Sequence, residues 1–182
     1  FLSDPEEGVP DLVARALLSR HEPAAAAPLS SILADEDQPY LVRARAARLL
    51  ADLGEEEGAD FLRRSLAGQS QLEKYLTAHW LLDAGDPAGL MPMIEIATDP
   101  ENASTFEGSL ASYLSPLMRE GSALPALRGG LRNALPEVRE FCARYLGRAR
   151  DEESFDLLFE LASKDPAPKV RVAANNALDR IR

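Results

Sequence analysis

Hydrophobic and polar residues follow each other along the chain with the spacing of α-helices. In residues 39–53 the apolar positions fall at i, i+4, i+7, i+8 and i+11, which places them on one helical face. Ala, Leu, Arg and Glu dominate, and period-two runs of β-branched residues are absent, so helix is favoured throughout. Glycine and proline interrupt the pattern at short intervals. The predicted helices lie near 10–20, 23–34, 39–53, 57–67, 70–84, 87–97, 104–119, 122–132, 136–149, 152–163 and 168–181.

The predicted helices form pairs that repeat about every 32 residues. The Val-Arg dipeptide at 42–43 recurs at 138–139 and 170–171, with offsets of 96 (138 minus 42) and 128 (170 minus 42). The turn glycine Gly54 recurs as Gly85, an offset of 31. A two-helix unit of this length indicates a helical solenoid, because one pair cannot bury its apolar faces without a neighbour.

Three segments carry a resemblance to a known family: "VRARAARLLADLGEEEGADFL", "VREFCARYLGRARDEESFDLL" and "DPAPKVRVAANNALDRI". They are similar to HEAT repeats, especially the short bacterial repeats of phycocyanobilin-lyase relatives. The resemblance covers nearly the whole chain and is clearest at 37–97 and 136–182. It implies an all-α fold, a right-handed α-α superhelix of about five helix pairs plus a terminal helix, in a single domain spanning 1–182. A HEAT-like pattern is specific for the fold and says little about function.

An acid, a proline and a basic residue recur around the start of the first helix of each pair. The prolines are Pro39, Pro136 and Pro166 or Pro168. A proline suits the first helical turn, where a missing N–H costs no hydrogen bond. We expect the acid to cap the helix, as the N-cap or just before it. The basic residues are expected to reach acids in adjacent turns; they are Arg43, Arg139 and Arg171, with Lys74 in the same column, and the expected partners are Asp37, Asp99 and Asp165.

Composition narrows the classes of protein to consider. Of 182 residues, 46% are hydrophobic and 27% are charged, which is typical of a globular protein with a sizeable core. The net charge of −10 makes the chain acidic and disfavours nucleic acid as a partner. No stretch approaches the ~20 apolar residues needed to cross a bilayer, so we expect no membrane partner. A cytoplasmic bacterial protein is expected, and because the chain starts at Phe1 we expect it to be part of a longer one.

The sequence offers little catalytic chemistry. It lacks a glycine-rich phosphate loop, a GxSxG elbow and an HExxH motif. The deoxyhypusine hydroxylases, which are HEAT-like, use several His-Glu pairs as iron ligands, but here His21-Glu22 is the single such pair. Cys142 shares a small-residue column with Ala46 and Ala174, which predicts a buried, inert thiol. We therefore expect no catalytic residue, no metal and no cofactor.

A binding surface can be proposed from the second helix of each pair, because these helices line the concave side of HEAT-like stacks. Aligning them gives columns that face away from the core, and between these columns lies a half-exposed one that contains Arg63, Ile94, Arg128 and Phe159. Met91, Ile94 and Phe159 could instead complete the core. The candidate binding residues are Arg63, Arg64, Met91, Glu95, Arg128, Arg132 and Glu160.

The resulting hypothesis is a non-enzymatic scaffold that binds a partner protein or peptide on its concave face. One alternative is a HEAT-like lyase or modifying enzyme, which would need a concave groove closed into a pocket with converging polar groups. Another is a phosphate-binding role for residues 128–150, which hold six basic residues and two acids. The oligomeric state stays open.

Overall fold

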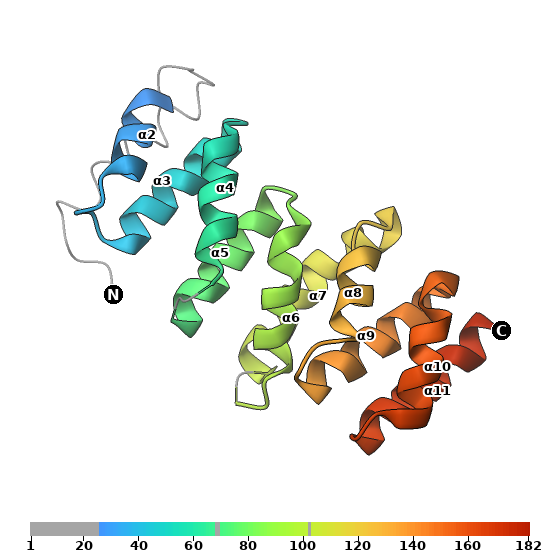
Figure 1. The fold of residues 1–182 in the computed structure, drawn as a ribbon. Helices are drawn as coiled ribbons and strands as arrows, with labels where there is room; N and C mark the ends of the chain where they lie inside the picture. Colours follow the sequence, from blue (N-terminus) through green and yellow to red (C-terminus); the bar gives the residue numbers. More distant parts are fainter. Residues whose placement is uncertain (1–25, 68–69, 102) are drawn as a thin grey trace. The chain divides into compact units, whose positions relative to one another are not determined.

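A computed structural model describes residues 26–67, 70–101 and 103–182 (Figure 1). Within these residues every regular element is a helix, which confirms the all-α prediction. The helix predicted at 10–20 lies outside the described residues. The α-helices are α2 (Ala26–Ala34), α3 (Tyr40–Asp52), α4 (Glu56–Ser65), α5 (Gln71–Asp83), α6 (Leu90–Thr98), α7 (Ala103–Glu120), α8 (Leu124–Gly130), α9 (Pro136–Ala149), α10 (Phe155–Lys164) and α11 (Pro168–Ile181), with 3₁₀ turns η2 (Pro87–Gly89) and η3 (Glu152–Ser154).

The chain divides into two compact units, residues 1–86 and 87–182. In the first unit α3 packs on α2, α4 and α5, and α4 also packs on α5. In the second unit α6 packs on α7, α8 and α9, while α11 packs on α9 and α10. Each unit therefore builds its core by packing helices that are neighbours in sequence or one repeat apart. That all 182 residues form one domain stays a prediction.

Tight turns with left-handed backbone geometry recur between the helices. Gly54, Gly85 and Gly121 have φ angles of 83°, 78° and 77°. Glycine reaches this region at little steric cost, whereas other residues do so less readily. Arg150, with φ of 52°, ends α9 at the position that lies 96 residues after Gly54, three repeat lengths on. The repeat therefore conserves the turn geometry even where the glycine is replaced.

The starts of the first helices agree with the predicted role of proline. Pro136 and Pro168 are the first residues of α9 and α11. The acid does not act as the N-cap, since the N-cap of α11 is Ala167. Instead, an Asp165 side-chain oxygen accepts a hydrogen bond from the Ala167 N–H at 2.9 Å. The acid thus shapes the turn that leads into the helix.

The recurring arginines connect turns, but only one of them pairs with an acid as predicted. Arg139 donates two hydrogen bonds to the Asp165 carboxylate, at 2.7 and 3.0 Å. This bidentate pair joins α9 to the turn before α11, and the Asp165 side chain is only 2% exposed. Arg43 instead donates to the Leu33 carbonyl at 3.0 Å, and Arg171 to the Asp165 carbonyl at 2.7 Å. The expectation of an acid partner is therefore wrong for Arg43, because its guanidinium reaches the end of α2.

Small residues allow close helix packing in the second unit. Cys142 on α9 is buried, as predicted, and burial raises the pKa of its thiol to about 12. Its sulfur lies against Gly130 at the end of α8, together with Met91 of α6. Farther along α9, Gly147 packs directly on Ala177 of α11. These contacts bring α6, α8, α9 and α11 into one tightly packed core.

Candidate functional site: a groove between α8 and α10

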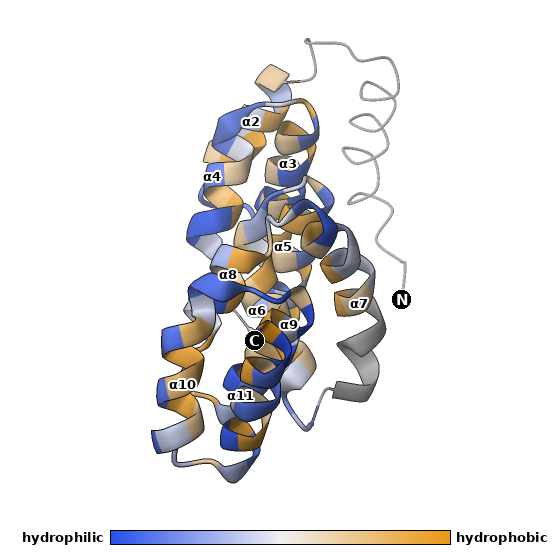
Figure 2. Cartoon of the chain, turned by 90° about the vertical axis from the view of Figure 1, so that its right-hand side faces the viewer, coloured by the Kyte–Doolittle hydropathy of each residue, from blue (hydrophilic) through white to orange (hydrophobic). Residues whose placement is uncertain are grey.

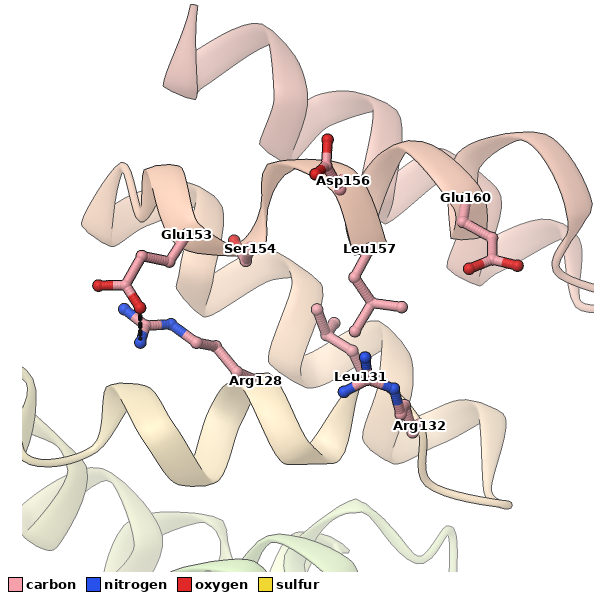
Figure 3. Close-up of a pocket in the computed structure, with 8 residues that line it drawn as sticks. All are labelled: Arg128, Leu131, Arg132, Glu153, Ser154, Asp156, Leu157 and Glu160. Atoms are coloured by element: carbon pink, nitrogen blue, oxygen red, sulfur yellow. Dashed lines mark hydrogen bonds and ion pairs between the residues drawn. The ribbon is translucent and has the colours of Figure 1, made fainter.

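A groove of about 320 Å³ lies between α8 and α10 of the second unit (Figure 3). One of its residues comes from α8, two from the turn that follows α8, two from η3 and three from α10. They are Arg128, Leu131, Arg132, Glu153, Ser154, Asp156, Leu157 and Glu160. The groove therefore combines an apolar floor with charged walls of both signs.

An arginine clamp closes one end of the groove. Arg128 binds both carboxylate oxygens of Asp151, one of them at 2.9 Å, and also donates to Glu153 at 2.6 Å. Asp151 is buried, and the Arg128 guanidinium holds the pKa of this carboxyl below its usual range. The clamp joins the end of α8 to the turn that starts the next pair.

The same clamp occurs in the first unit. Arg63 of α4 donates to Asp86 at 2.6 Å, and in both clamps the acid follows the arginine by 23 residues. Arg63 also pairs with Glu56 and Asp60, at 2.7 and 2.8 Å. Both arginines thus connect one helix pair to the turn that starts the next pair. Arg128 is half-buried, with a side chain that is 26% exposed, and it is held by two acids.

The other end of the groove carries charges that are open to solvent. Leu131 is buried and Leu157 is half-buried, and together they form the apolar floor. Arg132, in the turn after α8, and Glu160 of α10 are exposed and lie toward the same end of the groove (Figure 3). Within the described part of the chain Arg132 has no ion pair, and Glu160 approaches only Lys164, at 3.9 Å. These charges are accessible to a partner.

The structure brings part of the predicted binding set together. Arg128, Arg132 and Glu160 line the groove. Glu95 of α6 accepts a hydrogen bond from the Asn133 amide, just after Arg132, at 2.9 Å. The use of these residues in binding stays a prediction.

The remaining predicted residues lie elsewhere. Met91 on α6 is half-buried and packs at Gly130. Arg64 on α4 belongs to the first unit, as Arg63 does, and donates to the Asp60 carbonyl at 3.3 Å. These three residues are not among those that line the groove between α8 and α10.

One aligned column contains residues with very different environments. Ile94 is fully buried and completes the core, whereas Phe159 of α10 is 55% exposed. Phe159 lies one helical turn after Asp156, beside the groove. Sequence alignment placed these two residues in one column but could not show which of them is buried, because the burial of each depends on the neighbouring helix pair.

Several groove residues were missed by the sequence prediction. They are Leu131, Glu153, Ser154, Asp156 and Leu157. The 23-residue spacing from Arg63 to Asp86 and from Arg128 to Asp151 was a usable signal for the clamp. It would have shown that both arginines bind acids in the next turn.

The described residues give little support for a metal site or for a helix that spans a membrane. In residues 26–67, 70–101 and 103–182 no group of three or more His, Cys, Asp and Glu side chains is arranged to hold a metal ion. His79 lies 3.4 Å from Asp83, and His21 falls outside the described residues. No helix in the described part of the chain is both long enough and apolar enough to span a bilayer.

Comparison with known protein families agrees with this repeat architecture. A family model described as HEAT repeats matches residues 88–179, which is half of the chain. The match lies inside the second unit and includes every residue that lines the groove. No curated protein matches the chain.

Proposed function

The chain belongs to the HEAT-repeat family, and we propose that it is a non-enzymatic scaffold that binds a partner protein in the groove between α8 and α10. Repeat proteins of this kind offer extended surfaces on which partners bind. The observation that carries the proposal is the groove itself, in which an apolar floor lies between accessible charges. Protein interfaces typically combine an apolar centre with a polar rim in this way.

The groove specifies the chemistry of a partner segment. An apolar side chain would lie over the floor formed by Leu131 and Leu157, and it would contact mainly Leu157, because Leu157 is half-buried whereas Leu131 is only 1% exposed. A basic side chain would pair with Asp156 and Glu160, and an acidic one with Arg132. Phe159 would add apolar contact area at the rim.

The acids of the groove support binding rather than catalysis. Glu153, Asp156 and Glu160 are all exposed to solvent. An acid or base catalyst usually needs an environment that shifts its pKa toward neutrality, and burial is the usual means. A non-enzymatic role therefore suits the site better than a lyase-like one.

Site-specific photocrosslinking tests the proposal. A benzophenone amino acid is placed at Phe159, beside the groove, or at Val172 on α11, which is similarly exposed (55% and 60%). We expect a discrete crosslinked partner from position 159 in cells that express the full-length protein, and no such product from position 172. Adding Arg132→Ala or Glu160→Ala should weaken the crosslink at 159, because the partner loses a charged contact.

The result can also contradict the proposal. Equal crosslinking from both positions would show that the captured protein does not use the groove. Crosslinking that persists unchanged in the Arg132→Ala and Glu160→Ala variants would show the same.

A further inference from the structure

A second cavity of the second unit lies between α9 and α11 and is basic. It has a volume of about 100 Å³ and is lined by Arg144, Arg148, Ala173, Asn176, Ala177 and Arg180. Three guanidinium groups therefore surround a space comparable to about three water molecules, taking ~30 Å³ for each. In Figure 2 hydrophilic and hydrophobic segments alternate along the ribbon of α11.

The three arginines have unused hydrogen-bonding capacity. In the described residues none of Arg144, Arg148 and Arg180 forms an ion pair with an acid, in contrast to Arg128 and Arg139. An arginine that only stabilises the fold of an acidic chain would be expected to pair with one of its many carboxylates. Three unpaired arginines at one cavity instead concentrate positive charge on a protein whose net charge is −10.

Aromatic rings hold two of these guanidinium groups in place. The rings of Phe141 and Tyr145 stack on each other with centroids 4.4 Å apart. Arg144 lies over the Phe141 ring at 6.0 Å, and Arg148 over the Tyr145 ring at 4.9 Å. Stacking occupies the face of a guanidinium and leaves the N–H donors at its edge free. The side chains are thus partly ordered before any ligand binds, which lowers the entropic cost of binding.

Nearby acids do not neutralise the cavity. Glu140, one turn before Arg144, lies toward Lys169 at 3.9 Å. Asp179 is exposed and is not among the residues that line the cavity. The floor is apolar and small, because Ala173 and Ala177 are buried and Gly147 allows α9 to approach α11 closely. Asn176 adds an uncharged amide donor at the rim.

We propose that this cavity binds a phosphate group. Arginine edges match phosphate oxygens in bidentate geometry, and hydrogen bonds between two charged groups are stronger than neutral ones. A phosphate carries close to two negative charges at neutral pH and has oxygens pointing in several directions. It can therefore engage arginines from two helices together, whereas a planar, singly charged carboxylate can satisfy fewer of them. The site shares no residue with the groove between α8 and α10 and does not depend on it.

Isothermal titration calorimetry with two ligands tests this site. One ligand is inorganic phosphate, and the other is a short neutral peptide with a single phosphoserine, both in chloride buffer of matched ionic strength. The test variant Arg148→Gln/Arg180→Gln removes two charges at the cavity. The control Arg45→Gln/Arg119→Gln removes two charges from exposed arginines of α3 and α7. We expect the test variant to lose at least about tenfold in affinity, and the control to bind as the wild type does.

The comparison between ligands identifies the source of the phosphate. Tighter binding of the phosphopeptide supports a phosphorylated partner, and tighter binding of the free ion supports a small phosphate ligand. The variant Arg148→Lys/Arg180→Lys keeps the charge but loses the bidentate edge, so it should bind more weakly than the wild type. Circular dichroism confirms that each variant is folded. Absence of binding, equal loss in the control, or equal binding of a glutamate peptide would overturn the proposal.

Discussion

Replacing Gly147 with alanine perturbs the contact between α9 and α11 at a single carbon atom. A Cβ at this position would lie 2.5 Å from the Cα of Ala177 and 2.6 Å from its Cβ. Carbon atoms pack best at about 3.5–4.0 Å, so the helices would have to separate by about 1 Å. The close neighbour is backbone, which cannot rotate away as a long side chain would. The same contact forms the floor of the cavity between α9 and α11.

The expected loss of stability follows from two opposing effects. Forcing an extra methyl group into a packed core costs about 1–3 kcal/mol. Alanine favours a helix over glycine by about 1 kcal/mol. Because the close neighbour is backbone, we expect the steric cost to lie in the upper part of this range, at about 2–3 kcal/mol. The net loss is then about 1–2 kcal/mol, which corresponds to roughly a 5- to 30-fold change in the local equilibrium.

Gly129 provides a matched control in α8. Among the described residues no atom lies within 4 Å of the Cβ that alanine would add there. Gly129→Ala should therefore stabilise its helix by about 0.5–1 kcal/mol. The pair separates the steric effect from the effect of helix propensity, because both substitutions are glycine to alanine within a helix.

Hydrogen exchange measured by mass spectrometry reports the change locally. Peptides from α9 and α11 should exchange faster in Gly147→Ala, while peptides from α3 and α4 serve as an internal reference. Gly129→Ala should not accelerate exchange in α9 or α11. Slower or unchanged exchange in Gly147→Ala would refute the close packing of these helices.

Three further outcomes are expected from urea unfolding. Arg150→Gly should stabilise the chain by about 1 kcal/mol, because Arg150 has a φ angle of 52° and glycine tolerates this conformation better; equal stability would argue against backbone strain at this turn. Asp165→Ala should cost about 3 kcal/mol, because it leaves the guanidinium of Arg139 largely buried without its acid; a loss below about 1 kcal/mol would contradict this. Arginine and lysine partners lower the pKa of Asp151, Asp165 and Glu137 in the folded state. The stabilisation from these ionised carboxylates is therefore fully present above their unfolded pKa values of about 4, and it is lost as the pH falls through the lower folded pKa values. The free energy of unfolding should therefore fall between about pH 7 and pH 3, and this fall should be smaller in Asp165→Asn.

The sequence was sufficient to predict the helices because their determinants are local. Apolar spacing defines the buried face, and proline and glycine mark where helices start and turn, as at Pro136, Pro168 and Gly54. The 32-residue period then showed that helices pack in pairs. Burial of Cys142 followed from its column of small residues.

The candidate sites were harder to predict because they depend on contacts between repeats. Arg128 lies on α8 and Arg132 follows it by four residues, just after the helix, yet Arg128 is clamped by acids of the next pair and Arg132 is accessible. Sequence alone gives their spacing but not the position of Asp151. The cavity between α9 and α11 likewise depends on Gly147 and on the stacking of arginines on aromatic rings, which no periodic pattern reveals.

Partner binding in the groove between α8 and α10 can be measured on the purified protein. Once crosslinking at Phe159 has identified the partner, its dissociation constant shows whether the groove residues contact it. We predict that Arg132→Ala and Glu160→Ala each weaken binding, while Arg45→Ala and Asp179→Ala, exposed residues of α3 and α11, leave the dissociation constant unchanged. Equal affinity of all four variants and the wild type would show that the partner does not bind in this groove.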